Sequence, residues 1–346
     1  MTPSFFRSGR DAAVFLGIAE PAEWAAVEKR YPVLVNDYLL GLVDPANGAA
    51  DPIRRQFLPD SAELDDDHSE FDPLAESRQM LCPRMIRRFH DRVVVLVTAK
   101  CAARCRFCFR KRFWKSGENL PDISDAELTG MLDTLRKHPE IDEVLLSGGD
   151  PAMLSTSRLR EIIEAFSGLE QIVAIRLGTR TPSVWPRRFD PAFLDMLAGF
   201  DKLWLLSHFN HPAEITPEAA DVCRKLVKSG IPVLNQAVLL RGVNDDPEVL
   251  ESLFRKLLAV RVKPHYLFHV DPVRGVRHFA TGIDAGLEVL RRLRGRLSSL
   301  ATPTFAIDLP EGGGKVALQP DYSAEGGYWD IHNQKIIKYP DKEIEK

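Results

Sequence analysis

The sequence predicts an α/β fold in which six parallel strands and their crossover helices form a partial barrel of six β/α units. Two observations predict it. From residue 91 onward, short apolar runs alternate with helical patterns, which is typical of βαβ units. A chain of 346 residues is also long enough for one such barrel with extensions at both ends. In this fold, the chemistry is expected at the carboxyl ends of the strands.

The elements follow in order along the chain. Residues 1–88 are interrupted by proline and show only short helical patterns, so they are expected to form a helical extension. The barrel is expected over residues 89–281, and a loop-rich C-terminal segment over 282–346. Strands are expected at 91–99, 143–148, 172–178, 202–209, 232–240 and 263–270. Helices are expected at 22–31, 36–42, 125–137, 156–166, 190–197, 217–228, 247–258 and 283–297.

Composition excludes several classes of protein. The 49 acidic and 46 basic residues give a formal net charge of −3, which argues against a protein that coats nucleic acid. The longest uncharged stretch, residues 229–240, is too short to cross a membrane, and the N-terminus has no signal-peptide pattern. Five cysteines in a chain of this size argue against a disulfide scaffold, so we expect the reducing cytoplasm.

Three of those cysteines lie close together in "KCAARCRFCFRKR", where Cys101, Cys105 and Cys108 follow the first expected strand of the barrel. Packed thiols would be the plainest explanation. A structural zinc site would need a fourth ligand, such as Cys82 or a histidine. A [4Fe–4S] cluster held by three thiolates would leave one iron open to a chelating small molecule, and this interpretation suits the pattern best.

Two glycine-rich segments are candidate ligand sites. "LLSGGDP" ends the second expected strand and contains Ser147, Gly148, Gly149 and Asp150. Its glycines either let the backbone approach a ligand or form a tight strand-to-helix turn. In "DLPEGGGKVALQP", the residue after Lys315 is not Ser or Thr, so the segment is not a P-loop. Lys315 is either a solvated lysine on a surface loop or the attachment point of an aldehyde cofactor.

The cysteine spacing directly after a strand resembles that of the radical S-adenosylmethionine (SAM) superfamily. More specifically, "CRFCFRKR", "LLSGGDP", "IRLGTRTP", "SHFNHPAEIT", "NQAVLLRGVND" and "DLPEGGGKVALQP" occur in the order seen in lysine 2,3-aminomutases, over roughly residues 50–325. The resemblance implies a [4Fe–4S] cluster, SAM and pyridoxal 5′-phosphate (PLP) as cofactors. It assigns roles to twelve residues: Cys101, Cys105 and Cys108 on the cluster; Ser147, Gly148, Gly149, Asp150 and His208 around SAM or PLP; Lys315 on PLP; Arg110, Asp271 and Asp308 on the substrate.

The implied substrate residues agree with simple electrostatics. The guanidinium of Arg110 suits a carboxylate, because its fork donates two parallel hydrogen bonds. Asp271 and Asp308 would repel each other in a partly buried pocket unless a cation joins them. Such a pocket fits an amino acid with a distal positive charge: lysine, or arginine or ornithine with repacking. Glutamate would place anion against anion. The plain alternative is that both aspartates are ordinary strand-end carboxylates.

The resemblance therefore implies an isomerase that moves the α-amino group of L-lysine to C3, giving β-lysine, with an electron donor of the flavodoxin or ferredoxin type. Two groups of weaker candidates remain open. His208, Asn210, His211, Asn235 and Gln236 line the cofactor site or form a strand-end network. The PLP phosphate has four candidate cations: Arg106, Lys111, Arg112 and Arg180.

The chain also departs from the long lysine aminomutases. No cysteine follows Cys223, so their C-terminal zinc cluster is not expected, and a homo-oligomer is left open. Phe109 and the shorter length resemble relatives that make β-lysine for elongation factor P. Two other classes stay as alternatives: a PLP-independent radical SAM enzyme that modifies a macromolecule, and a non-catalytic cluster or zinc protein for electron transfer or assembly.

Overall fold

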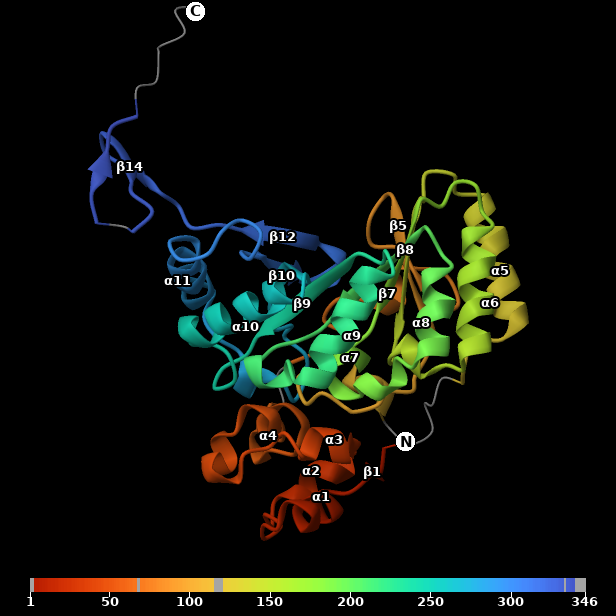
Figure 1. Ribbon diagram of the computed structural model, residues 1–346, viewed down its shortest axis with the longest axis horizontal. Helices are drawn as coiled ribbons and strands as arrows, with labels where there is room; N and C mark the ends of the chain where they lie inside the picture. The colour runs from red at the N-terminus through yellow and green to blue at the C-terminus, as the bar shows by residue number, and fades with distance from the viewer. Residues whose placement is uncertain (1–2, 67–68, 115–120, 333, 340–346) are drawn as a thin grey trace, which may run out of the picture.

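A ten-stranded sheet forms the centre of the molecule (Figure 1). The computed structural model describes residues 3–66, 69–114, 121–332 and 334–339. Seven consecutive strands run parallel: β5 (Arg92–Thr98), β6 (Glu143–Gly148), β7 (Ala174–Gly178), β8 (Leu203–Ser207), β9 (Val233–Leu239), β10 (Lys263–His269) and β11 (Thr304–Leu309). The six strands expected from the sequence are thus confirmed as parallel neighbours.

The sheet is longer than expected at both edges. β11 is a seventh parallel strand that the sequence analysis did not identify, because it is short and leads into Pro310 and a run of glycines. It continues into β12 (Gly314–Leu318), which pairs with it antiparallel. At the other edge, β4 (Met85–Ile86) and β3 (Met80–Cys82) add two antiparallel strands next to β5. The partial barrel is therefore extended by a hairpin at each side.

The two faces of the sheet differ in burial. In β9 every second residue is buried, and three of these four, Val233, Ala237 and Leu239, pack with the helices in the main core. The alternate residues, such as Gln236, are only half-buried and face the inside of the curved sheet. The same alternation occurs in β6 and β7. Because apolar burial against helices stabilises one face, the inner face is left available for polar side chains and ligands.

Helices cover the outer face of the sheet (Figure 1). They are α5 (Asp125–Arg136), α6 (Thr156–Ser167), α7 (Thr181–Val184), α8 (Pro191–Ala198), α9 (Pro217–Lys228), α10 (Pro247–Ala259) and α11 (Ile283–Arg294), with short 3-10 turns at Lys111–Trp114, Pro151–Met153, Pro186–Arg188, Pro212–Glu214, Arg277–Phe279 and Pro310–Gly312. Sequence signals set their starts: Ser124 and Glu127 form a capping box on α5. Thr216 caps α9, but Glu218 binds Arg187 instead of completing a capping box there.

The N-terminal segment lies below the barrel in Figure 1, next to α7. It contains β1 (Phe5–Phe6), α1 (Gly9–Leu16), α2 (Trp24–Arg30), β2 (Val35–Asn36), α3 (Asp37–Leu40), α4 (Pro52–Phe57) and 3-10 turns at Pro45–Ala50, Ser61–Glu63 and Glu76–Arg78. Its apolar core includes Ala102 and Ala103, which lie between the first two clustered cysteines. The amides of Arg104 and Arg106 donate to the carbonyls of Leu34 and Gln56. The segment therefore packs directly on the cysteine loop.

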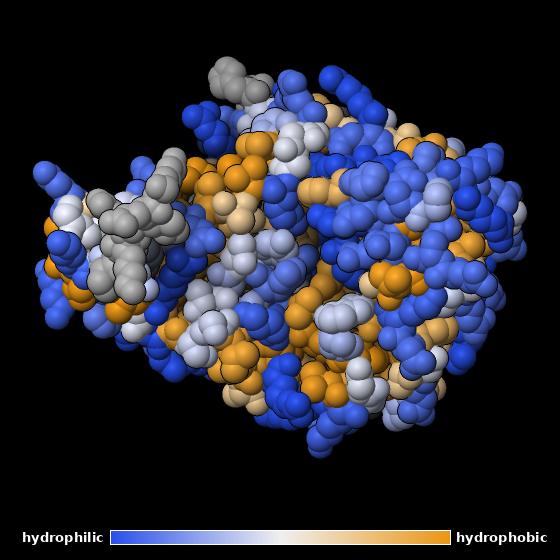
Figure 2. Space-filling view, turned by 90° about the horizontal axis from the view of Figure 1, so that it is seen from above, coloured by the Kyte–Doolittle hydropathy of each residue, from blue (hydrophilic) through white to orange (hydrophobic). Residues whose placement is uncertain are grey.

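The C-terminal part carries a separate small sheet. β13 (Ser323–Ala324), β14 (Gly327–Trp329) and β15 (Ile336–Ile337) pair antiparallel and project from the body at the upper left of Figure 1. The last residues of the expected C-terminal segment, 340–346, lie outside the described residues. No described helix combines the length and the apolar character that crossing a membrane requires. Figure 2 shows a mostly polar surface with apolar side chains gathered around a central hollow.

Candidate active site

The cysteine loop is held at the carboxyl end of β5 by two glycines on β6 and the turn after it. A Cβ on Gly149 would lie 2.3 Å from the carbonyl oxygen of Lys100, and one on Gly148 would lie 2.3 Å from that of Thr98. Both distances are far below a real Cβ contact, so only glycine lets the two chains approach this closely. The space that these glycines provide is thus filled by the backbone that leads into Cys101.

The three thiols sit in one electrostatic environment. Burial raises the pKa of Cys101 well above its usual value, and the neighbouring Asp150, Cys108 and Cys105 raise this pKa further. Burial and then Cys105 raise the pKa of Cys108 to about 11. Three thiolates this close together are unfavourable unless a cationic centre binds them. The donor set therefore fits an iron–sulfur cluster, whose irons take thiolate ligands.

The zinc alternative fits less well. Cys82 lies on β3 at the sheet edge, packs on the main core, and its side chain bonds Thr134 of α5. Cys105 belongs instead to two other apolar clusters, around the N-terminal segment and around Phe107. Cys82 therefore packs in different surroundings from Cys105, which leaves the zinc alternative without this fourth ligand. Within the described residues, no three His, Cys, Asp or Glu side chains are grouped as ligands of a single metal ion.

Asp150, the aspartate of the segment "LLSGGDP", links two loops. Its carboxylate accepts hydrogen bonds from the hydroxyls of Thr179 and Thr181, at 2.6 and 2.9 Å, and from the backbone amides of Ala152, Arg180 and Thr181. Burial still raises the pKa of Asp150, although these five bonds oppose it. The carboxylate thus joins the turn after β6 to the turn after β7 and holds both beside the cysteine loop.

Two buried nitrogen atoms near the cysteine loop lack protein partners in the described structure. They are Nε2 of His208, after β8, and Nε of Arg180, after β7. Phe107 lies between them, 5.6 Å from the His208 ring and 5.1 Å from the Arg180 guanidinium. Burial first, and then the Arg180 charge, lower the pKa of His208 well below its usual value. Orphaned buried polar atoms require an explanation, and a polar cofactor such as SAM supplies one.

Arg110 is already held from one side. Its Nε and Nη2 donate to the two carboxylate oxygens of Glu76, at 3.1 and 2.7 Å, and its Nη1 donates to Ser147 Oγ at 2.9 Å. Arg112 also binds Glu76, at 2.6 Å. Burial opposes ionisation of Glu76, but the Arg110 and Arg112 guanidinium groups hold its pKa down at about 2. The described bonds use three of the five N–H groups of Arg110, and two remain.

Asp271 and Asp308 supply negative charge to this site, opposite in sign to the Arg110 guanidinium. Asp271 follows β10, and Asp308 is the second-last residue of β11, the next strand of the sheet. Burial, and then the charge of Asp308, raise the pKa of Asp271 to about 7. The Arg88 guanidinium binds Asp308 at 3.1 Å and the carbonyl of Leu74 at 3.2 Å. Of the two carboxylates, Arg88 therefore binds only Asp308. Asp271 forms no ion pair within the described residues, and the charges of Arg88 and Lys315 act on it from a distance.

Lys315 lies on β12, directly opposite Asp308 across the antiparallel pair. The glycine-rich pattern predicts a loop for Lys315. The structure places Lys315 instead as the second residue of a strand, because β12 begins at Gly314, the last of the three glycines. Its Nζ lies 4.1 Å from the ring centre of Phe268 and 4.6 Å from that of Tyr266, both on β10. Burial lowers the pKa of Lys315 to about 8, against the opposing charge of Asp308. An amine of this kind is a better nucleophile at neutral pH than a solvated lysine.

These residues form one connected site. The charge of Asp271 acts on both Arg110 and Lys315, and the charge of Cys108 acts on Arg110. The structure therefore links the end of the cysteine loop, through Arg110 and Asp271, to Lys315 on the inner side of the sheet. Ser147 belongs to the same site through Arg110. The remaining expected residues, Gly148, Gly149, Asp150 and His208, surround the cysteine loop.

The weaker candidates have other partners. Arg106 and Lys111 bind Glu63, at 2.7 Å each, inside the interface with the N-terminal segment. Arg112 binds Glu76, and Arg180 binds Cys105, as well as Gln56 and Glu214. Asn210 and Asn235 are fully buried in a strand-end network, in which Asn235 Oδ1 accepts from the Phe209 amide at 2.8 Å. Cys223 is a packed thiol on α9, as expected.

Sequence reasoning missed four polar side chains. Glu76, Arg88 and Gln56 come from the N-terminal segment and the chain that leads into β5, and Arg176 comes from β7. The charge of Arg176 acts on Lys315, and its Nε is buried without a partner. The only available signal was for Arg176, because an arginine on the inner face of a buried strand is unusual. The other three carry no motif of their own.

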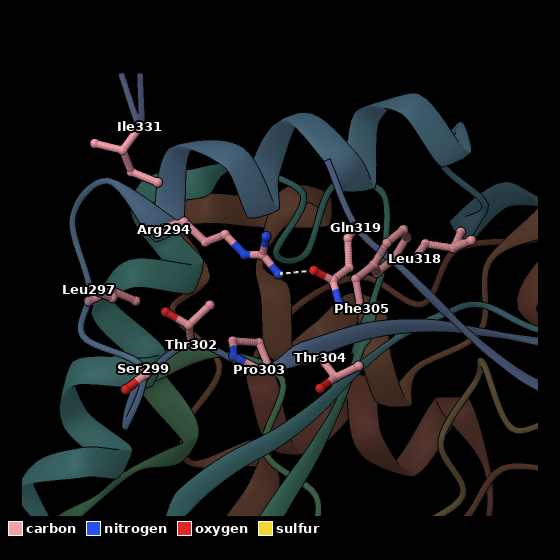
Figure 3. A pocket seen from close by; sticks show the side chains of 10 residues that line it. All are labelled: Arg294, Leu297, Ser299, Thr302, Pro303, Thr304, Phe305, Leu318, Gln319 and Ile331. Carbon is pink, nitrogen blue, oxygen red and sulfur yellow. Dashed lines mark hydrogen bonds between the residues drawn. The ribbon is translucent and has the colours of Figure 1, made fainter. Parts of the chain in front are cut away.

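One described surface cleft lies elsewhere. It has a volume of about 470 Å³ and lies between the end of α11, β11 and β12 (Figure 3). Arg294 Nη2 donates to Gln319 Oε1 at 3.0 Å in this cleft. Its ten lining residues include no cysteine, histidine or carboxylate, so it offers no acid, base or thiolate for chemistry. The site on the inner face is a better candidate because charged groups converge there.

Comparisons with known proteins identify the family. The Radical SAM superfamily model matches residues 95–253, and the model described as Lysine-2,3-aminomutase matches residues 290–327. A protein of Aquifex aeolicus (strain VF5) is 45% identical over 91% of this chain and 86% of its own. The L-lysine 2,3-aminomutase of Clostridium subterminale is 38% identical over 85% of this chain and 70% of its own.

A relative with a different substrate in its name is equally similar. The glutamate 2,3-aminomutase of Clostridioides difficile (strain 630) is 38% identical over 85% of this chain and 69% of its own. Among solved structures, a radical SAM methyltransferase from Sphaerobacter thermophilus covers 64% of this chain and 68% of its own, with a TM-score of 0.47 and 20% identity. Sequence identity to the relatives therefore does not distinguish lysine from glutamate as the substrate. The charges of the site are needed to make that distinction.

Proposed function

Since the chain belongs to the lysine 2,3-aminomutase family of radical SAM enzymes, we propose that it moves the α-amino group of L-lysine to C3 and gives β-lysine. Such an enzyme is an isomerase, and it uses a [4Fe–4S] cluster, SAM and PLP. The observation that carries the substrate proposal is the charge distribution: one guanidinium at Arg110, and two carboxylates with a single guanidinium partner at Asp271 and Asp308.

The substrate carboxylate is proposed to bind Arg110. Glu76 occupies the Nε and Nη2 side of the guanidinium, and two N–H groups remain for a second carboxylate. Glu76 itself stays ionised at neutral pH, because its pKa is about 2. We therefore assign Glu76 a positioning role: it fixes the plane of the Arg110 guanidinium, so that the remaining donors point in one direction.

The ε-ammonium is proposed to bind between Asp271 and Asp308. Arg88 binds Asp308, whereas Asp271 has no ion-pair partner within the described residues, so Asp271 is the carboxylate that attracts a further cation. A lysine side chain supplies that charge. Glutamate would bring a third carboxylate to the same place, at a large electrostatic cost. Arginine and ornithine remain alternative substrates, since both carry a distal cation.

Three groups of residues would hold the cofactors. Cys101, Cys105 and Cys108 would ligate the cluster, and the region around His208 would hold SAM. Lys315 would hold PLP, and the inner-face cations Arg176 and Arg92 would hold its phosphate, because both charges act on Lys315. When bound, the cluster and SAM supply a 5′-deoxyadenosyl radical, and PLP supplies the π-system that carries the migrating nitrogen.

The chain's own contribution is to position the substrate and to exclude water. Arg110 and the Asp pair fix the two ends of the substrate, and this selects which C–H bond faces the radical. The low pKa of Lys315 keeps a fraction of this amine neutral at pH 7. The N-terminal segment covers the cysteine loop and keeps solvent from it.

The compartment, the electron donor and the destination of the product are also proposals. Reduced thiols favour the cytoplasm, and the cluster requires a one-electron donor of the flavodoxin or ferredoxin type. Elongation factor P is a candidate destination for β-lysine. A PLP-independent enzyme that modifies a macromolecule is the second candidate function, but it leaves the low pKa of Lys315 and the Asp271–Asp308 pair unexplained.

A substrate panel tests the proposal. The anaerobically reconstituted enzyme is given PLP, SAM and a reductant with lysine, ornithine, arginine or glutamate, and products are derivatised and identified by mass spectrometry. We expect β-lysine as the main product. The variant Asp271→Asn should lose turnover of lysine, whereas it should still cleave SAM with the reductant alone. Turnover of glutamate above that of lysine would contradict the proposal.

A further inference from the structure

Arg180 makes a direct contact with one of the three clustered cysteines. It follows β7 by two residues and is almost fully buried, with 8% of the residue exposed. Its Nη1 donates a hydrogen bond to Cys105 Sγ at 2.8 Å. The guanidinium therefore places a positive charge and a hydrogen-bond donor directly at the sulfur of a proposed cluster ligand.

The guanidinium is fixed by three further contacts. Its Nη2 donates to Gln56 Oε1 at 2.6 Å and to Glu214 Oε2 at 3.3 Å, and its plane lies 4.6 Å from the ring centre of Phe57. Gln56 Nε2 in turn donates to Glu214 Oε1 at 2.9 Å. Gln56 and Glu214 are both completely buried. A buried network with this many partners leaves the Nη1–H group aimed at the sulfur.

We propose that Arg180 tunes the redox potential of the cluster through its hydrogen bond to Cys105. This inference rests on the proposed ligation by Cys101, Cys105 and Cys108. A donor of the flavodoxin or ferredoxin type delivers one electron to the oxidised [4Fe–4S] cluster, and no bond to protein forms or breaks. The reduced cluster carries one more negative charge. A hydrogen-bonded cation at a ligand sulfur stabilises that charge and makes the cluster easier to reduce.

The network also makes the N-terminal segment part of the cofactor site. Gln56 lies on α4 of that segment, and Arg180 lies 124 residues further along the chain. The backbone of Gln56 accepts a hydrogen bond from the amide of Arg106, inside the cysteine loop. Gln56 thus contacts both the cysteine loop and Arg180, and Arg180 in turn bonds Cys105. Arg180 is a positioning residue for the cluster, and Gln56 and Glu214 position Arg180.

An EPR-monitored redox titration tests the inference on the reconstituted enzyme without substrate. The variant Arg180→Met removes the hydrogen-bond donor and the positive charge, and it keeps an unbranched side chain of similar size. At a fixed solution potential, we expect its ratio of reduced to oxidised cluster to fall about tenfold, equivalent to a midpoint lowered by about 59 mV for one electron. The matched control is Arg84→Met, which removes another buried arginine, one that binds Glu127 and the carbonyl of Pro121. We expect the control to keep the wild-type ratio.

The outcomes are distinguishable. An Arg180→Met enzyme with wild-type iron content and a ratio within twofold of wild type would overturn the inference. If Arg180→Met does not accumulate because Glu214 is left buried and unpaired, the double variant Arg180→Met with Glu214→Gln takes its place under the same criterion. The proposed ligation is checked separately with Cys105→Ala. Wild-type iron content in that variant would overturn the proposed cluster site itself.

Discussion

The pH dependence of lysine turnover follows from the pKa of Asp271. Burial and the nearby charge of Asp308 raise this pKa from 3.8 to about 7, so the group changes charge in the range where the enzyme works. Binding an ε-ammonium requires the ionised form. With a pKa of 7, about one carboxyl in eleven is ionised at pH 6 and about ten in eleven at pH 8. We therefore expect kcat/KM for lysine to rise about tenfold from pH 6 to pH 8, because kcat/KM reports the free enzyme.

Bound lysine should change this profile. Its ε-ammonium stabilises the carboxylate, so the midpoint of kcat should lie at lower pH than the midpoint of kcat/KM. The variant Asp308→Asn removes the repelling charge and should move the kcat/KM midpoint to lower pH, with weaker binding. Asp271→Asn should abolish the rise and lower kcat/KM at pH 8 by about 10- to 150-fold, the range for a lost hydrogen bond to a charged group, about 1.5–3 kcal/mol.

The assay is anaerobic turnover between pH 6 and pH 8, with β-lysine measured by mass spectrometry. Reductive cleavage of SAM without lysine, measured at each pH, serves as the control for effects on the cluster. The reasoning would be refuted by a wild-type kcat/KM that is flat over this range after correction by the control. It would equally be refuted if Asp271→Asn kept the rise of the wild-type enzyme.

Three further predictions concern the scaffold. Lys315→Ala should lose the visible absorbance of lysine-bound PLP while still cleaving SAM with a reductant; a wild-type absorbance spectrum would exclude Lys315 as the attachment point. Glu63→Ala leaves the completely buried Arg106 and the buried Lys111 without their shared carboxylate. This change should lower the free energy of unfolding, measured with denaturant, by about 3–5 kcal/mol. A loss below about 1 kcal/mol would show that the network is not stabilising. Gly149→Ala places a Cβ against the Lys100 carbonyl and should sharply lower iron incorporation, whereas Gly130→Ala, where a Cβ meets nothing within 4 Å, should leave it unchanged; equal iron contents would contradict the packing argument.

The parts of the molecule that the sequence predicted are those encoded locally. A continuous apolar run such as residues 91–99 indicates a buried strand whatever lies next to it, so β5 and its neighbours could be identified from pattern alone. The three cysteines lie within eight residues, and their spacing already restricts the chemistry. Helix starts such as Ser124 were predicted for the same reason, since a cap bonds backbone three residues away.

The parts that were missed depend on contacts between distant segments. Glu76 and Arg110 are 34 residues apart, and Arg88 and Asp308 are 220 apart. Neither Glu76 nor Arg88 belongs to a motif, and each acquires its role only when the fold brings its partner near. β11 was missed because its six residues lead directly into a proline and glycine run that indicates a loop. Lys315 was identified from its motif, but its place on a strand opposite Asp308 needed the structure.

The most direct test of the proposed function follows the nitrogen atom itself. L-Lysine labelled with ¹⁵N on its α-amino group is incubated anaerobically with the reconstituted enzyme, PLP, a reductant and SAM well below the lysine concentration. The account predicts β-lysine that carries ¹⁵N on C3, in many-fold excess over the SAM present, with SAM recovered at the end. Consumption of SAM to methionine and 5′-deoxyadenosine, with the label still on C2 of lysine, would contradict it.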